Sequence, residues 1–119
     1  MRLLLVLFTL LGAGAAAAGE ADVLDVKVQR EQAGTYRFAV TVRHADQGEQ
    51  HYADRWEVVT PDGKVLATRA LQHPHVKEQP FTRTLVGVKI PPGVRRVTVR
   101  AHDKVHGTGG KDLTVDLPK

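Results

Sequence analysis

The amino-acid sequence predicts an all-β domain, an antiparallel sandwich of seven short strands. Apolar and polar residues alternate with a period of two in several segments, a pattern typical of strands that bury one face. Turn signals separate these segments at intervals of roughly ten residues, as they do in β-sandwiches. No segment shows helical periodicity over three turns, so the sequence predicts strands and turns throughout the folded part of the chain.

The first two strands follow from alternation alone. Leu24, Val26 and Val28 alternate with polar residues, which predicts a half-buried first strand. The second strand, residues 36–43, has the clearest alternation in the chain. Its four apolar positions are Tyr36, Phe38, Val40 and Val42.

The later strands are delimited by turn residues. They are expected at residues 55–60, 65–71, 81–90, 97–102 and 113–117. A tight turn is expected at Pro61-Asp62-Gly63, because proline presets φ and glycine accepts a positive φ. Gly87 lies inside a long strand and marks an expected bulge, and Pro91-Pro92-Gly93 turns the chain once more. The expected core consists of Tyr36, Phe38, Val40, Trp56, Val97, Val99 and Val115.

The single tryptophan, Trp56, lies on the third expected strand. This position resembles that of the buried tryptophan of immunoglobulin domains. The chain has no cysteine, so it lacks the disulfide of antibody-type domains. The resemblance is therefore to the general immunoglobulin-like or fibronectin-like β-sandwich.

Residues 1–18 are predicted to be a signal peptide. Met1-Arg2 is a short positive segment, residues 3–11 are apolar, and Ala16-Ala17-Ala18 satisfies the small-x-small cleavage rule. The apolar run is too short to be a permanent membrane span, and the alternative is an uncleaved helix. We expect export through the Sec pathway to the periplasm of a Gram-negative bacterium, with residues 19–119 forming a single β-sandwich domain.

The amino-acid composition limits the kinds of partner that we expect for this chain. The chain has 17 basic and 13 acidic residues, a net charge of +4, with no basic block and few aromatic residues. Nucleic acid is therefore not an expected partner. Because cysteine is absent, we expect no disulfide, no cysteine-linked lipid and no stable membrane anchor after cleavage of the leader.

The six histidines form three pairs, and each pair belongs to one connection between expected strands. Successive connections of an antiparallel sandwich alternate between its two ends, and only the second, fourth and sixth connections carry histidine. If the strand count is correct, all six imidazoles lie at one end, where they could bind a transition metal. The pairs are His44 and His51, His73 and His75, and His102 and His106.

The fourth connection contains the sequence His73-Pro74-His75. On an extended backbone, residues i and i+2 point to the same side, so both imidazoles could reach one ion. Pro74 restricts the backbone and lowers the entropy lost on binding. The alternative is a polar loop with two solvated histidines.

The other two pairs differ in how strongly they indicate a metal site. His102 and His106 flank Asp103, which could ligate a metal or orient an imidazole, although a flexible glycine-rich hairpin is the alternative. His44 and His51 bracket residues 45–50, whose polar side chains look like ordinary solvated surface. This pair is therefore the weakest of the three.

The available donors favour a borderline ion. The only methionine is Met1, which leaves with the leader, and cysteine is absent, so a Cu(I) site is disfavoured. Imidazole and carboxylate suit Cu(II), Zn(II) or Ni(II), with copper the first expectation and zinc the second.

Three segments, residues 52–56, 73–83 and 102–106, resemble those of small uncharacterised exported proteins of proteobacteria. The resemblance covers most of the mature domain and implies export and a sandwich fold, without implying site residues. A more distant similarity connects the chain to periplasmic copper-resistance sandwich proteins. The chain lacks their methionine-rich stretch, so their mechanism is not implied.

The sequence does not predict an enzyme. It has no serine, no cysteine nucleophile, no phosphate loop and no His-Glu-x-x-His motif. A redox metalloenzyme of the superoxide dismutase kind, also a sandwich, stays open. The leading hypothesis is a periplasmic copper- or zinc-binding module. The alternatives are a structural accessory domain or an envelope interaction module, the latter using Tyr52, Arg55, Arg69 and Arg83.

Overall fold

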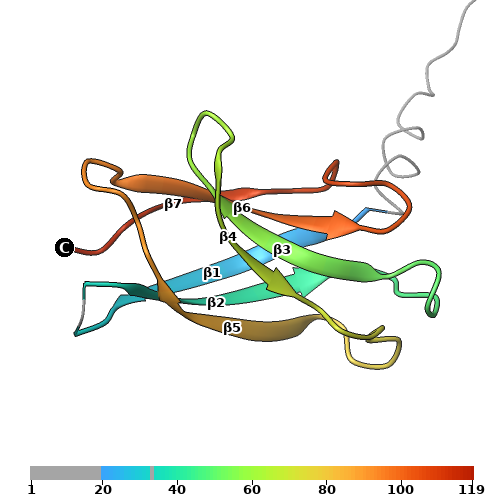
Figure 1. The fold of residues 1–119 in the computed structure, drawn as a ribbon. Helices are drawn as coiled ribbons and strands as arrows, with labels where there is room; N and C mark the ends of the chain where they lie inside the picture. Colours follow the sequence, from blue (N-terminus) through green and yellow to red (C-terminus); the bar gives the residue numbers. More distant parts are fainter. Residues whose placement is uncertain (1–19, 33) are drawn as a thin grey trace, which may run out of the picture.

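The computed structural model describes residues 20–119, except residue 33, and the predicted signal peptide lies outside these residues. The described chain forms two antiparallel sheets packed face to face (Figure 1). No helix in this part of the chain is long and apolar enough to cross a membrane. The strands are β1 (Asp22–Arg30), β2 (Tyr36–Arg43), β3 (Ala53–Val59), β4 (Val65–Ala70), β5 (Phe81–Val88), β6 (Arg96–Asp103) and β7 (Leu113–Asp116).

The two sheets have three and four strands. Their orders are β1-β2-β5 and β4-β3-β6-β7, and every paired strand is antiparallel to its neighbour. The chain crosses from one sheet to the other three times, between β2 and β3, between β4 and β5, and between β5 and β6. The predicted all-β sandwich of seven antiparallel strands is confirmed.

Alternation along the strands creates the core. In β2, Phe38, Val40 and Val42 are fully buried while the intervening side chains face outward. Trp56 of β3 is also fully buried between the sheets. Of the seven residues predicted for the core, five are fully buried, and Tyr36 and Val115 pack against them while partly exposed.

The register shifts at two places in the three-stranded sheet. The pairing of β2 with β5 shifts between Tyr36 and Phe38, next to Gly87, whose φ is +69°, so the predicted bulge is confirmed. A second shift lies between Val23 and Asp25 in β1. The extra residue reverses the alternation there, so Val23 fills the core and Leu24 is only half-buried, contrary to the simple alternation expected for this strand.

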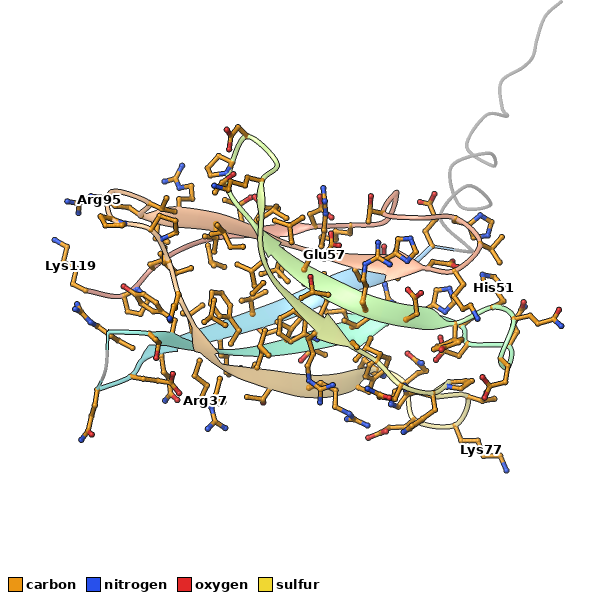
Figure 2. The ribbon with its side chains drawn as sticks, in the orientation of Figure 1. Arg37, His51, Glu57, Lys77, Arg95 and Lys119 are labelled. Atoms are coloured by element: carbon orange, nitrogen blue, oxygen red, sulfur yellow. The ribbon has the colours of Figure 1, made fainter. Side chains whose placement is uncertain are left out.

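The connections β2–β3, β4–β5 and β6–β7, which carry every histidine except His102 of β6, meet at one end of the sandwich, as the strand count predicted (Figure 1). We call this end, formed by residues 44–52, 71–80 and 103–112, the histidine pole. Figure 2 labels His51 and Lys77 at this pole and Arg95 and Lys119 at the opposite end. Side-chain contacts between the connections, described below, hold the pole together.

Candidate metal centre

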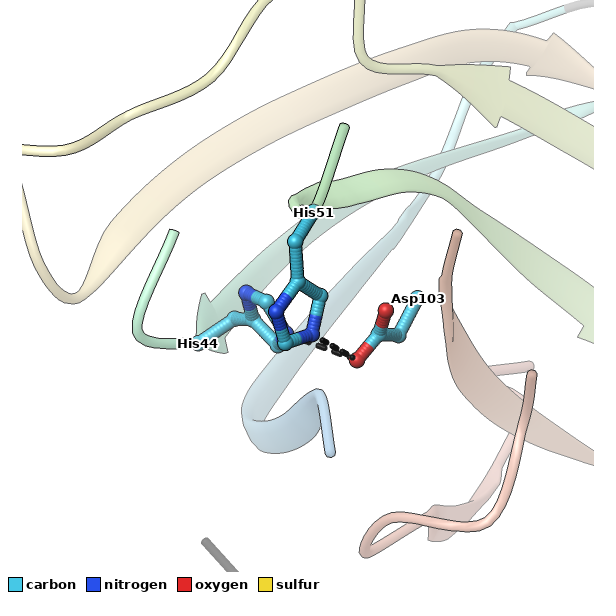
Figure 3. A group of neighbouring side chains, drawn as sticks. All are labelled: His44, His51 and Asp103. Atoms are coloured by element: carbon cyan, nitrogen blue, oxygen red, sulfur yellow. Dashed lines mark hydrogen bonds and ion pairs between the residues drawn. The ribbon is translucent and has the colours of Figure 1, made fainter. Parts of the chain in front are cut away.

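Three side chains converge inside the histidine pole: His44, His51 and Asp103 (Figure 3). Nε2 of His44 lies 2.8 Å from Oδ2 of Asp103, and Nε2 of His51 lies 3.0 Å from the same oxygen. One potential ligand atom from each residue lies within 4.8 Å of the other two. The cluster thus joins the β2–β3 connection to the end of β6.

Strand alternation explains why these polar side chains point inward. Every second residue from Phe38 to Asp46 is buried, so the core-facing row of β2 runs on beyond the strand to His44 and Asp46. In β6 the buried row from Val97 ends at Asp103, which is completely buried. Polar side chains therefore occupy the core-facing positions where β2 and β6 reach the histidine pole.

A second layer of acceptors orients the two imidazoles. Nδ1 of His44 lies 2.5 Å from Oδ1 of Asp46, and Nδ1 of His51 lies 2.7 Å from Oε1 of Gln47. Ligating histidines in metal sites commonly donate their outer N–H to such an acceptor, which leaves the other nitrogen for the ion. Both Nε2 atoms here are accordingly directed at Asp103.

Asp46 also ties the cluster to the surrounding backbone. Its Oδ1 accepts a hydrogen bond from the Ala53 N–H at 3.1 Å, and its Oδ2 accepts one from the His75 N–H at 2.6 Å. Sequence reasoning missed Asp46, because its neighbours are exposed polar residues. The signal that would have found it is the period-two burial that continues past the end of β2.

The electrostatics of the cluster centre on a buried charge pair. Burial disfavours the charged form of His44, but its hydrogen bonds with Asp46 and Asp103 outweigh this and raise its pKa. Burial likewise opposes ionisation of Asp103, yet the Val105 N–H and the two histidines lower its pKa. The raised pKa of His44 favours its imidazolium form, in which both ring nitrogens can donate, one to the carboxylate of Asp46 and one to that of Asp103.

The cluster is close to the spacing that a metal requires. Ligands about 2.0–2.1 Å from a tetrahedral Zn(II) lie about 3.3 Å from each other. The two Nε2–Oδ2 distances, 2.8 and 3.0 Å, need to open by only a few tenths of an ångström. An ion would take the place of the protons between these atoms, and the second layer would still hold the rings.

The fourth connection, whose two imidazoles were expected to reach one ion, does not contribute to the cluster of His44, His51 and Asp103. The rings of His73 and His75 lie 4.8 Å apart, but His75 is only 6% exposed and stacks on Phe81 at 4.0 Å. Its Nε2 lies 3.0 Å from a guanidinium nitrogen of Arg83. Burial, together with the charge of Arg83, lowers the pKa of His75, which disfavours the charged form of this imidazole.

His102 lies apart from the cluster because alternation turns it to the outer face of the four-stranded sheet. Its Nδ1 is 2.6 Å from Oδ1 of Asp54 and 3.2 Å from Nη1 of Arg55. His106 is exposed, and its ring centroid lies 5.2 Å from that of His51. The structure therefore brings His44, His51 and Asp103 together, with His106 beside them.

The residues that the sequence suggested for a protein interface make separate contacts in the structure. Arg55 pairs with Glu57 at 3.0 Å, and Arg69 donates to the Thr84 carbonyl at 3.0 Å. Tyr52 is largely buried, with the Lys104 ammonium 5.1 Å from its ring centroid. Each of these side chains is engaged in its own local contacts.

Comparison with known proteins finds one informative similarity. The chain is 43% identical over 97 residues to a protein of the haloarchaeon Halomicrobium mukohataei named "Putative lipoprotein". The match covers 82% of this chain and 47% of that protein, so the chain spans about half of the relative's length. No protein family matches the chain, and no solved structure matches it.

Proposed function

We propose that the chain is an extracytoplasmic metal-binding module whose His44, His51 and Asp103 hold one divalent transition ion. The observation that carries this proposal is the convergence of two Nε2 atoms on one carboxylate oxygen, while both Nδ1 atoms already have acceptors. Metal sites regularly contain such a second layer of acceptors behind their histidine ligands.

Zn(II) and Cu(II) are the ions that the donors suit. Two imidazole nitrogens and one carboxylate oxygen are borderline ligands, and affinity for such donors peaks at Cu(II). These three ligands leave one coordination position, on the side of the cluster where His51 is partly exposed. A site that an ion can reach from solvent suits reversible binding, so buffering or delivery of the ion is the proposed role, without catalysis.

An extracytoplasmic location fits both lines of support. The first 18 residues have the features of a signal peptide. The similar haloarchaeal protein carries the name of a lipoprotein, a class that is attached to the outer face of a membrane. The bacterial periplasm is the compartment that we propose for this chain.

A second function is favoured by the same buried charges. The imidazolium of His44 bridges Asp46 and Asp103 at 2.5 and 2.8 Å, and Asp46 also binds the backbone of the fourth connection. This arrangement would tie three connections together without a metal. In that case the pole is a structural device that stabilises the domain.

Isothermal titration with Zn(II) and with Cu(II) at neutral pH distinguishes the two functions. We expect one ion per chain for the wild-type protein, and an affinity at least about tenfold weaker for His51→Ala. His51 is the suitable target because its side chain is 18% exposed, so its removal spares the buried pair. The matched control is His73→Ala, an exposed histidine outside the cluster, which should bind like wild type. Equal affinity for His51→Ala and wild type would contradict the metal site and favour the structural function.

A further inference from the structure

We infer that His106 is the fourth ligand of the proposed ion and closes the site on its solvent side. The inference rests on the proposed function and adds a ligand from the connection between β6 and β7. It also defines the direction from which the ion enters and leaves. Geometry, backbone order and chemistry support it separately.

Exposure increases across the cluster in one direction. The side chains of His44 and Asp103 are 1% and 0% exposed, that of His51 is 18% exposed, and His106 is exposed. The core therefore closes one side of the cluster, and the side facing His106 is open to solvent. A fourth ligand from the protein has to approach from this side.

The ring spacings match those of imidazoles that share one tetrahedral ion. A ring centroid lies about 3.2 Å from an ion bound at about 2.0–2.1 Å, so two such centroids lie about 5.2 Å apart. The centroids of His51 and His106 are 5.2 Å apart, and those of His44 and His51 are 4.9 Å apart. His51 thus has an imidazole neighbour at ligand spacing on each side.

Spacing alone does not define a ligand pair, as the fourth connection illustrates. The rings of His73 and His75 are 4.8 Å apart, but Nε2 of His75 faces the Arg83 guanidinium and its Nδ1 is buried. The positive charge of Arg83 disfavours binding of a metal cation at Nε2 of His75. His106, in contrast, is exposed to solvent beside the ring of His51.

A tight turn holds His106 beside the ligand Asp103. The N–H groups of Asp103 and Gly107 each donate to the carbonyl of the other at 2.9 Å, and the Val105 N–H donates to the Asp103 carboxylate at 2.7 Å. The Lys104 N–H further donates to the Tyr52 carbonyl at 3.1 Å. These hydrogen bonds order the turn when the domain folds. His106 then reaches the ion by rotation of its side chain.

Co(II) absorption and Zn(II) competition with a chelator test this ligand in the wild-type protein, His106→Ala and the control His102→Ala. We expect intense visible bands for Co(II) in wild type and His102→Ala, as in tetrahedral sites. For His106→Ala we expect weaker, shifted bands and a Zn(II) affinity lower by at least about tenfold. Added imidazole should restore the bands of His106→Ala, which a merely structural role of His106 would not produce.

The outcomes separate the inference from the proposed function. If wild-type protein binds Co(II) and Zn(II) and His106→Ala gives the same bands and affinity, the inference alone is overturned. If wild-type protein binds neither ion, the proposed function fails and the inference fails with it. Because His106 is exposed, its replacement by alanine leaves the fold intact, which circular dichroism of the variant checks.

Discussion

Replacing Asp103 by asparagine should strongly destabilise the metal-free domain, although the two side chains have nearly the same shape. Asp103 is fully buried, and its Oδ2 accepts hydrogen bonds from both His44 and His51. Its Oδ1 accepts the N–H of Val105 at 2.7 Å. An asparagine has one oxygen, so its amide group must face an N–H donor on one side or the other.

The magnitude follows from the charge that is left behind. Removing one partner of a buried ion pair costs about 3–5 kcal/mol, because the other charge stays buried without compensation. Here the remaining charge is that of the His44 imidazolium, which still faces Asp46. A domain of this size is stabilised by roughly 5–15 kcal/mol, so Asp103→Asn is expected to remove a large fraction of the unfolding free energy.

Urea unfolding in the presence of a metal chelator measures this effect. With a slope of about 1–3 kcal/mol per molar urea, the midpoint should fall by at least about 1 M. The control is Asp25→Asn, which breaks an exposed pair with Lys27 and should change stability by less than about 0.5 kcal/mol. A loss of less than about 1 kcal/mol for Asp103→Asn would refute the buried charge pair.

Two further predictions concern parts of the fold outside the pole. Burial opposes ionisation of Glu57, but the two arginines that flank it lower its pKa below 4.5, so its contribution to stability is present above that pH and is lost in more acidic solution. The stability difference between wild type and Glu57→Gln, measured by urea unfolding, should be largest near neutral pH and shrink below about pH 4.5, and a constant difference would contradict this. Gly110→Ala would place Cβ 1.9 Å from the Ala21 carbonyl oxygen, so the start of β1 must move. Its melting temperature should fall by several degrees, at about 4–8 °C per kcal/mol, and an unchanged value would show that the contact relaxes without cost.

The strand pattern was predictable because a strand that buries one face alternates apolar and polar residues along the sequence. Alternation in β2 identified the buried Phe38 and Val40, and counting connections placed the histidine loops at one end. The error at Leu24 came from a bulge, which shifts the register through backbone geometry that a period-two pattern does not contain. The period-two pattern was therefore sufficient to predict which side chains are buried wherever the strand has no bulge.

The candidate site was harder to predict because its members follow strand geometry beyond the strand ends. Asp46 was assigned to a solvated loop and the pair of His44 and His51 was considered the weakest, yet His44 and Asp46 occupy the core-facing row that begins in β2. Alternation along β6 turns His102 outward and Asp103 inward. The burial of His75 depends on its stacking with Phe81, a tertiary contact with no counterpart in local sequence.

Nitrogen-15 NMR of the imidazole rings during titration with Zn(II) tests the central claim most directly. Metal binding at Nε2 should shift the Nε2 resonances of His44 and His51, while their Nδ1 atoms keep the protons that face Asp46 and Gln47. The resonances of His102, on the outer face of the sheet, should not change. Unchanged Nε2 resonances of His44 and His51 at saturating Zn(II), or shifts confined to histidines outside the cluster, would contradict a metal site at this pole.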